Sequence, residues 1–458
     1  MTTSPGIPAD AGVSSAVRHA LGWLVFGNSA GLYLAMLLLY PSLQLADWTY
    51  GRWVPVHLNV QLYGWTSLPL VAWLLSIYEV DRSRVSRWAP AAVWAWSAAL
   101  ALGVYHWLGG VTSGKIFLDW KGGALWALMA ALVILWFVLA AAWQNRSAGW
   151  NKRRRLAALA GLIGLALVPA SLILTSSPAT YPPVDRTTGG PTGSSLLGSA
   201  LVVVGLMLLL PRLAAKVRDG RDRPPSGPCE WKEDSGSCGY QTASNDRDSS
   251  TLHSPDRCGE RSLPFLKKIP GIWIFFGVSW IVFGVTEAIG GTHHDVHQIG
   301  AMLFLLPWVW WLPRDGSHFD WPEGSRSWRM AMFAWWGLLV VSGLWMYQPG
   351  VLDRLKFTQG LVAHSHLAMA GFTTSFCALL LVLLTGRRMG GAVSVVVWHV
   401  AALAMIVTLT VMGWGEGAGP AWMSAQPAWR ELGLVVRALS GGLMLAVSLL
   451  WLHERRRL

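Results

Sequence analysis

Two histidines, His364 and His366, stand inside the apolar segment 358–384, which is long enough to cross a lipid bilayer as one helix. Each helical residue turns the chain by about 100°, so side chains two residues apart leave a helix on opposite sides. Ionisable groups at membrane depth are costly and point to a function. The H-x-H pair therefore predicts a helix wedged between two metal centres, with one imidazole directed at each.

Three further histidines accompany this pair. His57 lies in the segment GRWVPVHLNVQLYGW, and His293 and His294 lie together in EAIGGTHHDVHQIG, with His297 just beyond them. A low-spin haem needs two axial nitrogens from opposite sides, which His57 and one member of the H-x-H pair could supply. The other member could hold a second haem from one side, and His293 with His294 could ligate a non-haem metal opposite it.

The composition predicts that these residues are carried by a polytopic membrane protein. Of 458 residues, 53% are hydrophobic and 13% are charged, with a mean hydropathy of +0.41. We predict an all-α bundle of twelve transmembrane helices, the eighth being short enough to need an extension into its flanks. The predicted spans are 17–40, 56–77, 88–108, 122–143, 156–174, 194–210, 269–289, 298–312, 328–347, 358–384, 393–412 and 432–452.

The charges of the loops predict the orientation. Lys and Arg gather in alternate loops and in the tail 455–457, which places both termini in the cytoplasm by the positive-inside rule. The net charge of +12 is thus a feature of topology and does not indicate nucleic-acid binding. Segment 217–262 is polar and of low complexity and predicts a disordered cytoplasmic linker between spans 1–6 (1–216) and spans 7–12 (263–458) of one integral domain.

With this topology the five histidines meet at one level of the membrane. The second and tenth spans run inward, so His57, His364 and His366 occupy their outer portions. The seventh span runs outward and ends near His293 and His294. Imidazoles from three helices at one depth favour metal binding. We interpret His106 and His399, by contrast, as packed core residues.

These motifs and the twelve-span layout resemble subunit I of the haem–copper oxidase superfamily, most closely its cbb3-type branch. The resemblance implies that His57 and His366 ligate a low-spin haem and that His364 holds a high-spin haem, both of b-type. It also implies that His293 and His294 bind the copper called CuB. It also implies oxygen reduction with electrons from cytochrome c, c-type haem partner subunits in a hetero-oligomeric respiratory complex, and a bacterial inner or plasma membrane.

The chain differs from that family at two positions. The sixth span begins GGPTGSSLLGS and lacks the histidine that supplies a third copper ligand, and Glu287 stands where the cbb3-type branch has a redox tyrosine. Glu287 or His297 could complete the metal site. A nitric oxide reductase-like or haem-only electron-transfer relative is therefore the alternative function, and a twelve-span solute transporter is a remote one.

Three arginines are candidates for binding the haem propionates. Arg437 lies inside the twelfth span, where a guanidinium without an anion would be costly, and Arg430 lies two turns earlier. Arg52 precedes His57 by five residues. For Arg430 and Arg52, interfacial snorkelling is the simpler alternative.

Overall fold

The computed structural model describes residues 11–115, 117–184, 197–218, 270–419 and 427–456. Within these ranges the chain is helical, with one isolated bridge between Leu45 and Trp48 and no strand. Eleven helices there are long and apolar enough to cross a membrane, and the helix α7 contains a shorter apolar stretch, Ser199–Arg212. The predicted all-α polytopic membrane architecture is confirmed, while the count of twelve spans stays a prediction.

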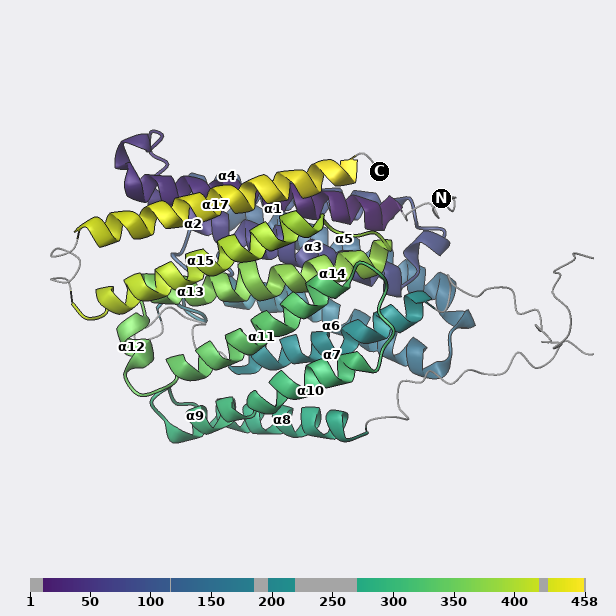
Figure 1. Ribbon diagram of the computed structural model, residues 1–458. Coiled ribbons are helices and arrows are strands. Elements are labelled where there is room, and N and C mark those ends of the chain that lie inside the picture. Colours follow the sequence, from purple (N-terminus) through teal and green to yellow (C-terminus); the bar gives the residue numbers. More distant parts are fainter. Residues whose placement is uncertain (1–10, 116, 185–196, 219–269, 420–426, 457–458) are drawn as a thin grey trace, which may run out of the picture.

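The long helices, the candidate spans and α7 among them, lie side by side as an elongated bundle (Figure 1). In chain order they are α1 (Ala11–Leu39), α2 (Tyr50–Asn59) with α3 (Ser67–Ile77), α4 (Trp88–Leu108), α5 (Gly122–Arg146), α6 (Lys152–Ser176), α7 (Leu197–Arg218), α8 (Pro270–Ile289), α9 (Val296–Leu303) with α10 (Leu306–Ser317), α11 (Arg326–Met346), α13 (Gln359–His366) with α14 (Thr374–Thr385), α15 (Ala392–Glu416) and α17 (Pro427–Arg456). The eighth span does extend into its flanks, because α9 and α10 together cover Val296–Ser317.

Burial is arranged as a bilayer requires. The span formed by α13 and α14 is the most enclosed, with 72% of its apolar window buried, whereas α6 has 17% and α8 has 22%. Large apolar side chains on these two helices, such as Leu167 and Ile281, point outward and are more than half exposed. In water such surfaces would be unfavourable, so α6 and α8 are expected to face lipid.

The two ends of the bundle carry different features. α1 begins and α17 ends at the same end (Figure 1). α9, α13 and the short helix α12 (Val351–Leu355) lie toward the opposite end, which we call the far end. The far end is the outer end in the predicted orientation.

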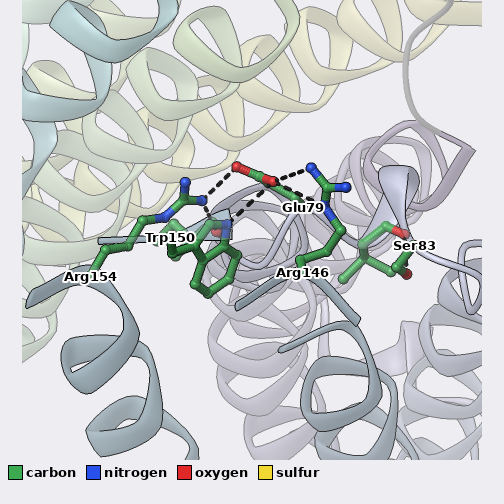
Figure 2. A network of polar contacts seen from close by, with 7 residues as sticks. Glu79, Ser83, Arg146, Trp150 and Arg154 are labelled. Atoms are coloured by element: carbon green, nitrogen blue, oxygen red, sulfur yellow. Dashed lines mark hydrogen bonds and ion pairs between the residues drawn. The ribbon is translucent and has the colours of Figure 1, made fainter. Parts of the chain in front are cut away.

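An ion-pair network closes the loop between α3 and α4. Glu79 has a left-handed backbone, with φ at +53°, and its carboxylate accepts hydrogen bonds from Arg154 at 2.7 Å and Arg146 at 3.2 Å (Figure 2). The indole nitrogen of Trp150 lies 3.5 Å away. Since Arg146 ends α5 and Arg154 belongs to α6, one carboxylate links the end of α3 to both of these helices.

The predicted domain organisation lies partly outside the described residues. The linker 217–262 falls almost entirely in the range 219–269, and the start of the predicted sixth span falls in 185–196. The division into two six-span halves therefore stays a prediction.

Candidate functional site

Two π-helical segments follow the histidines of the second and tenth spans. α2 passes into the segment Val60–Thr66 three residues after His57, and α13 passes into Leu367–Thr373 directly after His366. π-Helical turns inside α-helices occur frequently at functional sites because they re-aim the neighbouring side chains. Neither segment is indicated by the sequence pattern.

A buried side-chain hydrogen bond connects the first of these segments to the beginning of α14, directly after the second. Trp65 donates its indole N–H to the hydroxyl of Thr374 at 3.1 Å, and that hydroxyl donates in turn to the carbonyl of Met369 at 3.0 Å. Trp65 and Thr374 are both buried. The contact therefore fixes the spacing between the two histidine-bearing helices within the membrane.

The rings of His57 and His366 face one another from these helices. Their centres are 6.4 Å apart and their planes differ by 25°. A metal–imidazole bond is about 2 Å long and a ring centre lies about 1 Å behind its nitrogen, so two imidazoles sharing one iron stand about 6 Å apart. The observed separation matches the distance expected for two imidazoles with one metal ion between them.

Backbone carbonyls orient both rings. The Nδ1 atom of His57 lies 2.8 Å from the carbonyl oxygen of Gly27, and the Nδ1 atom of His366 lies 2.8 Å from that of Val362. A carbonyl can only accept, so each Nδ1 carries the proton and each Nε2 keeps its lone pair. This is the arrangement that usually supports a metal-ligating histidine.

A cavity next to this pair has the lining that a haem needs. Its empty volume, including the open mouth, is about 870 Å³, and its wall includes His57, His366, Arg437, Phe117 and Met369. The largely apolar wall, paired imidazoles and one arginine fit the faces, iron and propionates of a haem, respectively.

Arg437 is held at this cavity by polar neighbours. It is only 7% exposed, and one of its five N–H groups has an acceptor among the described residues, the side-chain oxygen of Gln359 at 3.0 Å. The backbone N–H of Gln359, the first residue of α13, donates to Glu416 at 2.7 Å. Arg437 can thus offer its remaining donors to an anion in the cavity.

His364 occupies the opposite side of α13. Its Nδ1 atom lies 3.2 Å from the hydroxyl oxygen of Ser342 on α11, and that hydroxyl donates to the carbonyl of Leu339. The Ser342 oxygen therefore acts as acceptor, which places the proton of His364 on Nδ1 and leaves Nε2 as the possible ligand. The H-x-H pair is directed at two different helices, as the sequence predicts.

A second cluster of metal-binding groups lies toward the far end. One donor atom from each of His293, His294 and Asp353 lies within 4.8 Å of the others. Burial and the neighbouring His294 lower the pKa of His293 from its ordinary value, although Asp353 opposes the shift. A neutral imidazole is the form that binds metals. The sequence analysis missed Asp353, because it belongs to α12, outside all predicted spans.

The two residues suggested as completing that cluster lie elsewhere. Glu287 is exposed on the surface of α8. His297 directs its Nε2 atom at the carbonyl of Gly290, 2.7 Å away, as does the side-chain amide of Gln298 at 3.0 Å. Glu287 and His297 are therefore not members of the cluster, and His297 instead anchors the loop that carries it.

The remaining arginine candidates do not line the cavity of Arg437. Arg52 donates from its Nη1 atom to the carbonyl of Leu108 at the end of α4, 3.2 Å away. Arg430 is exposed near the beginning of α17. Both positions are compatible with the snorkelling that the sequence offers as an alternative.

Comparisons with known proteins do not identify these two clusters. No family model matches the chain, and no curated protein matches it either. Their chemistry therefore has to be inferred from the donor atoms themselves.

Proposed function

We propose that this protein is a membrane-bound haem oxidoreductase, similar to the catalytic subunit of a terminal oxidase. It would pass electrons from cytochrome c through a low-spin haem to a high-spin haem, where oxygen is reduced to water. The observation that carries the proposal is the 6.4 Å separation of the His57 and His366 rings beside a largely apolar cavity that Arg437 also lines. Partner subunits with c-type haem would deliver the electrons.

His57 and His366 would be the axial ligands of the low-spin haem. Bound haem supplies the one-electron chemistry. The carbonyls of Gly27 and Val362 hold the two imidazoles in the tautomer that presents Nε2 to the iron, so little reorganisation accompanies each electron transfer. Arg437 would compensate the propionate charge inside the membrane, where an unpaired carboxylate is costly.

His364 would hold the high-spin haem from the other side of α13. Only Ser365 separates His364 from His366 in the chain, so one helix would support both groups and keep their distance fixed. Ser342 would keep the proton of His364 on Nδ1, directed away from the metal. Bound there, that haem would supply the chemistry that reduces the gaseous substrate.

A haem-only electron-transfer protein is the second candidate, and the second donor cluster favours it. The resemblance to haem–copper oxidases implies a copper held by three imidazoles, whereas the described residues offer two imidazoles and a carboxylate. His294 is also 53% exposed. These groups do not fit a buried three-histidine copper, so no step of the proposed reaction is assigned to copper.

Absorbance spectroscopy of the purified full-length protein tests the proposal. We expect a low-spin b-type spectrum with about two haems per chain, and the loss of the low-spin bands in both His57→Ala and His366→Ala. His399→Ala is the matched control, since His399 also lies within a span but accepts a hydrogen bond from Trp335 and lines no part of the cavity. A colourless wild-type protein would refute the proposal and leave the transporter alternative.

Turnover assays then separate the two candidates. The terminal-oxidase proposal predicts oxygen consumption with reduced cytochrome c, together with carbon monoxide binding at the haem of His364. Electron transfer without consumption of either oxygen or nitric oxide would support the haem-only protein, and nitric oxide turnover alone would indicate a nitric oxide reductase.

A further inference from the structure

We propose that His293, His294 and Asp353 form a two-histidine, one-carboxylate site for a non-haem ferrous ion. This inference goes beyond the proposed haem function and does not depend on it. The three residues come from the loop after α8 and from α12, which are about 60 residues apart in the chain.

The donor atoms already converge. The Nε2 atom of His293 lies 3.3 Å from one oxygen of Asp353, and the Nε2 atom of His294 lies 3.1 Å from the other. Metal bonds of about 2.0–2.2 Å place adjacent ligand atoms roughly 3 Å apart. An ion could therefore replace the present imidazole–carboxylate contacts with small side-chain movements.

The backbone that presents the histidines is fixed by its own contacts. Gly291 has φ at +101°, and an added Cβ there would lie 2.7 Å from an oxygen of Asp295. That oxygen accepts the backbone N–H of Thr292 at 2.6 Å. With His297 holding Gly290, the loop places two consecutive histidines with their ring centres 4.1 Å apart.

Lys356 sets the coordination mode of the carboxylate. Its ammonium donates to Oδ1 of Asp353 at 2.8 Å, and the pair also reduces the local negative charge. Oδ2 is the oxygen left for a single metal bond. Two imidazoles and one monodentate carboxylate occupy three positions around the ion.

The exposure of the cluster argues against a structural zinc. His293 is 1% exposed, but His294 is 53% and Asp353 is 32% exposed, so water can fill further positions. Structural zinc sites are closed by four protein ligands. A two-histidine, one-carboxylate set with open positions is typical of non-haem ferrous iron.

Metal analysis of the full-length protein tests this assignment. The protein is purified anaerobically with a tag that contains no histidine, and total iron, copper and zinc are measured per chain. Haem iron is measured separately by the pyridine haemochrome and subtracted. We expect about one non-haem iron per wild-type chain, and for Asp353→Asn an affinity for added Fe²⁺ that is at least about 10–100-fold weaker.

Two variants guard against misinterpretation. Asp47→Asn removes an exposed carboxylate from the loop between α1 and α2 and is expected to keep the iron. Asp353→Glu keeps a carboxylate, so recovery of iron with this variant would separate lost ligation from misfolding, with a symmetric size-exclusion profile as the folding readout.

The outcomes are distinguishable from those of the haem proposal. Loss of non-haem iron in Asp353→Asn with haem content unchanged supports the site, and so does an iron-loaded protein that binds no haem. A wild-type protein with stoichiometric copper or zinc in place of iron overturns the assignment. So does a protein that takes up no Fe²⁺, which would leave the three residues as an ion pair between the α8–α9 loop and α12.

Discussion

The two clusters of donors differ in the gap that they leave. His57 and His366 come from two enclosed spans, and their ring centres stand 6.4 Å apart beside a largely apolar cavity. His293, His294 and Asp353 sit in a loop and a short helix, with their donor atoms within 4.8 Å of one another. The first gap suits a planar cofactor with an iron at its centre, whereas the second suits a bare ion. The spacing of similar side chains thus separates two kinds of ligand.

The largest effect is expected when His364 is removed. Because His364 and His366 leave α13 on opposite sides, we expect His364→Ala to abolish carbon monoxide binding and to halve the haem content while the low-spin bands persist. Absorbance difference spectra of the reduced protein measure both effects. Disappearance of the low-spin bands with carbon monoxide binding retained would reverse the two haem assignments.

The next largest effect concerns Gly31, where the absence of a side chain leaves room for the ring of His57. A Cβ at Gly31 on α1 would lie 2.7 Å from Cε1 of His57, which is closer than real Cβ contacts. We expect Gly31→Ala to displace the His57 ring and to lower low-spin haem occupancy severalfold, as measured by haem per chain.

Gly22→Ala on the same helix is the matched control for this prediction. A Cβ at Gly22 meets no atom within 4 Å, so this variant is expected to bind haem normally. Equal haem content in the two variants would argue against His57 as an axial ligand. Non-haem iron is expected to be unaffected in both.

Arg437 offers a smaller test of the same cavity. Replacing it by Gln removes a buried positive charge beside the histidine pair, so we expect weaker haem retention during purification and a lower midpoint potential, because the oxidised, more positive haem becomes easier to form. A potentiometric titration measures the shift. Arg430→Gln alters an exposed charge and is expected to give a much smaller change.

Glu79 provides a control outside both clusters. Burial raises the pKa of Glu79, but its hydrogen bonds and ion pairs with Arg154 and Arg146 lower the pKa by more. The pKa therefore lies below its ordinary value of 4.5. The stabilisation is present above about pH 4.5 and is lost as the pH falls through the lower pKa of the folded protein.

We expect Glu79→Gln to destabilise the protein by about 1–2 kcal/mol at neutral pH, with haem and non-haem iron contents unchanged. Thermal unfolding in detergent measures this, and the difference from wild type should shrink in acid. A difference that is independent of pH would show that the carboxylate charge is not what links α3, α5 and α6.

Much of the haem-binding candidate site was accessible from the sequence. The H-x-H spacing on a helix, the apolar spans and the positions of His57 and Arg437 are local properties, since helix geometry and hydrophobic length fix which residues share a face and a depth. The all-α membrane architecture follows from the same local patterns and is confirmed.

The second cluster required the tertiary structure. Asp353 follows the span α11 in a five-residue helix, and nothing in its own neighbourhood indicates that it meets His293 and His294 about 60 residues earlier. The two π-helical segments, and the contact between Trp65 and Thr374, are likewise invisible in hydrophobic periodicity. Residues within one helix are related by a fixed rotation, whereas residues on separate elements meet only where packing and loop paths bring them together.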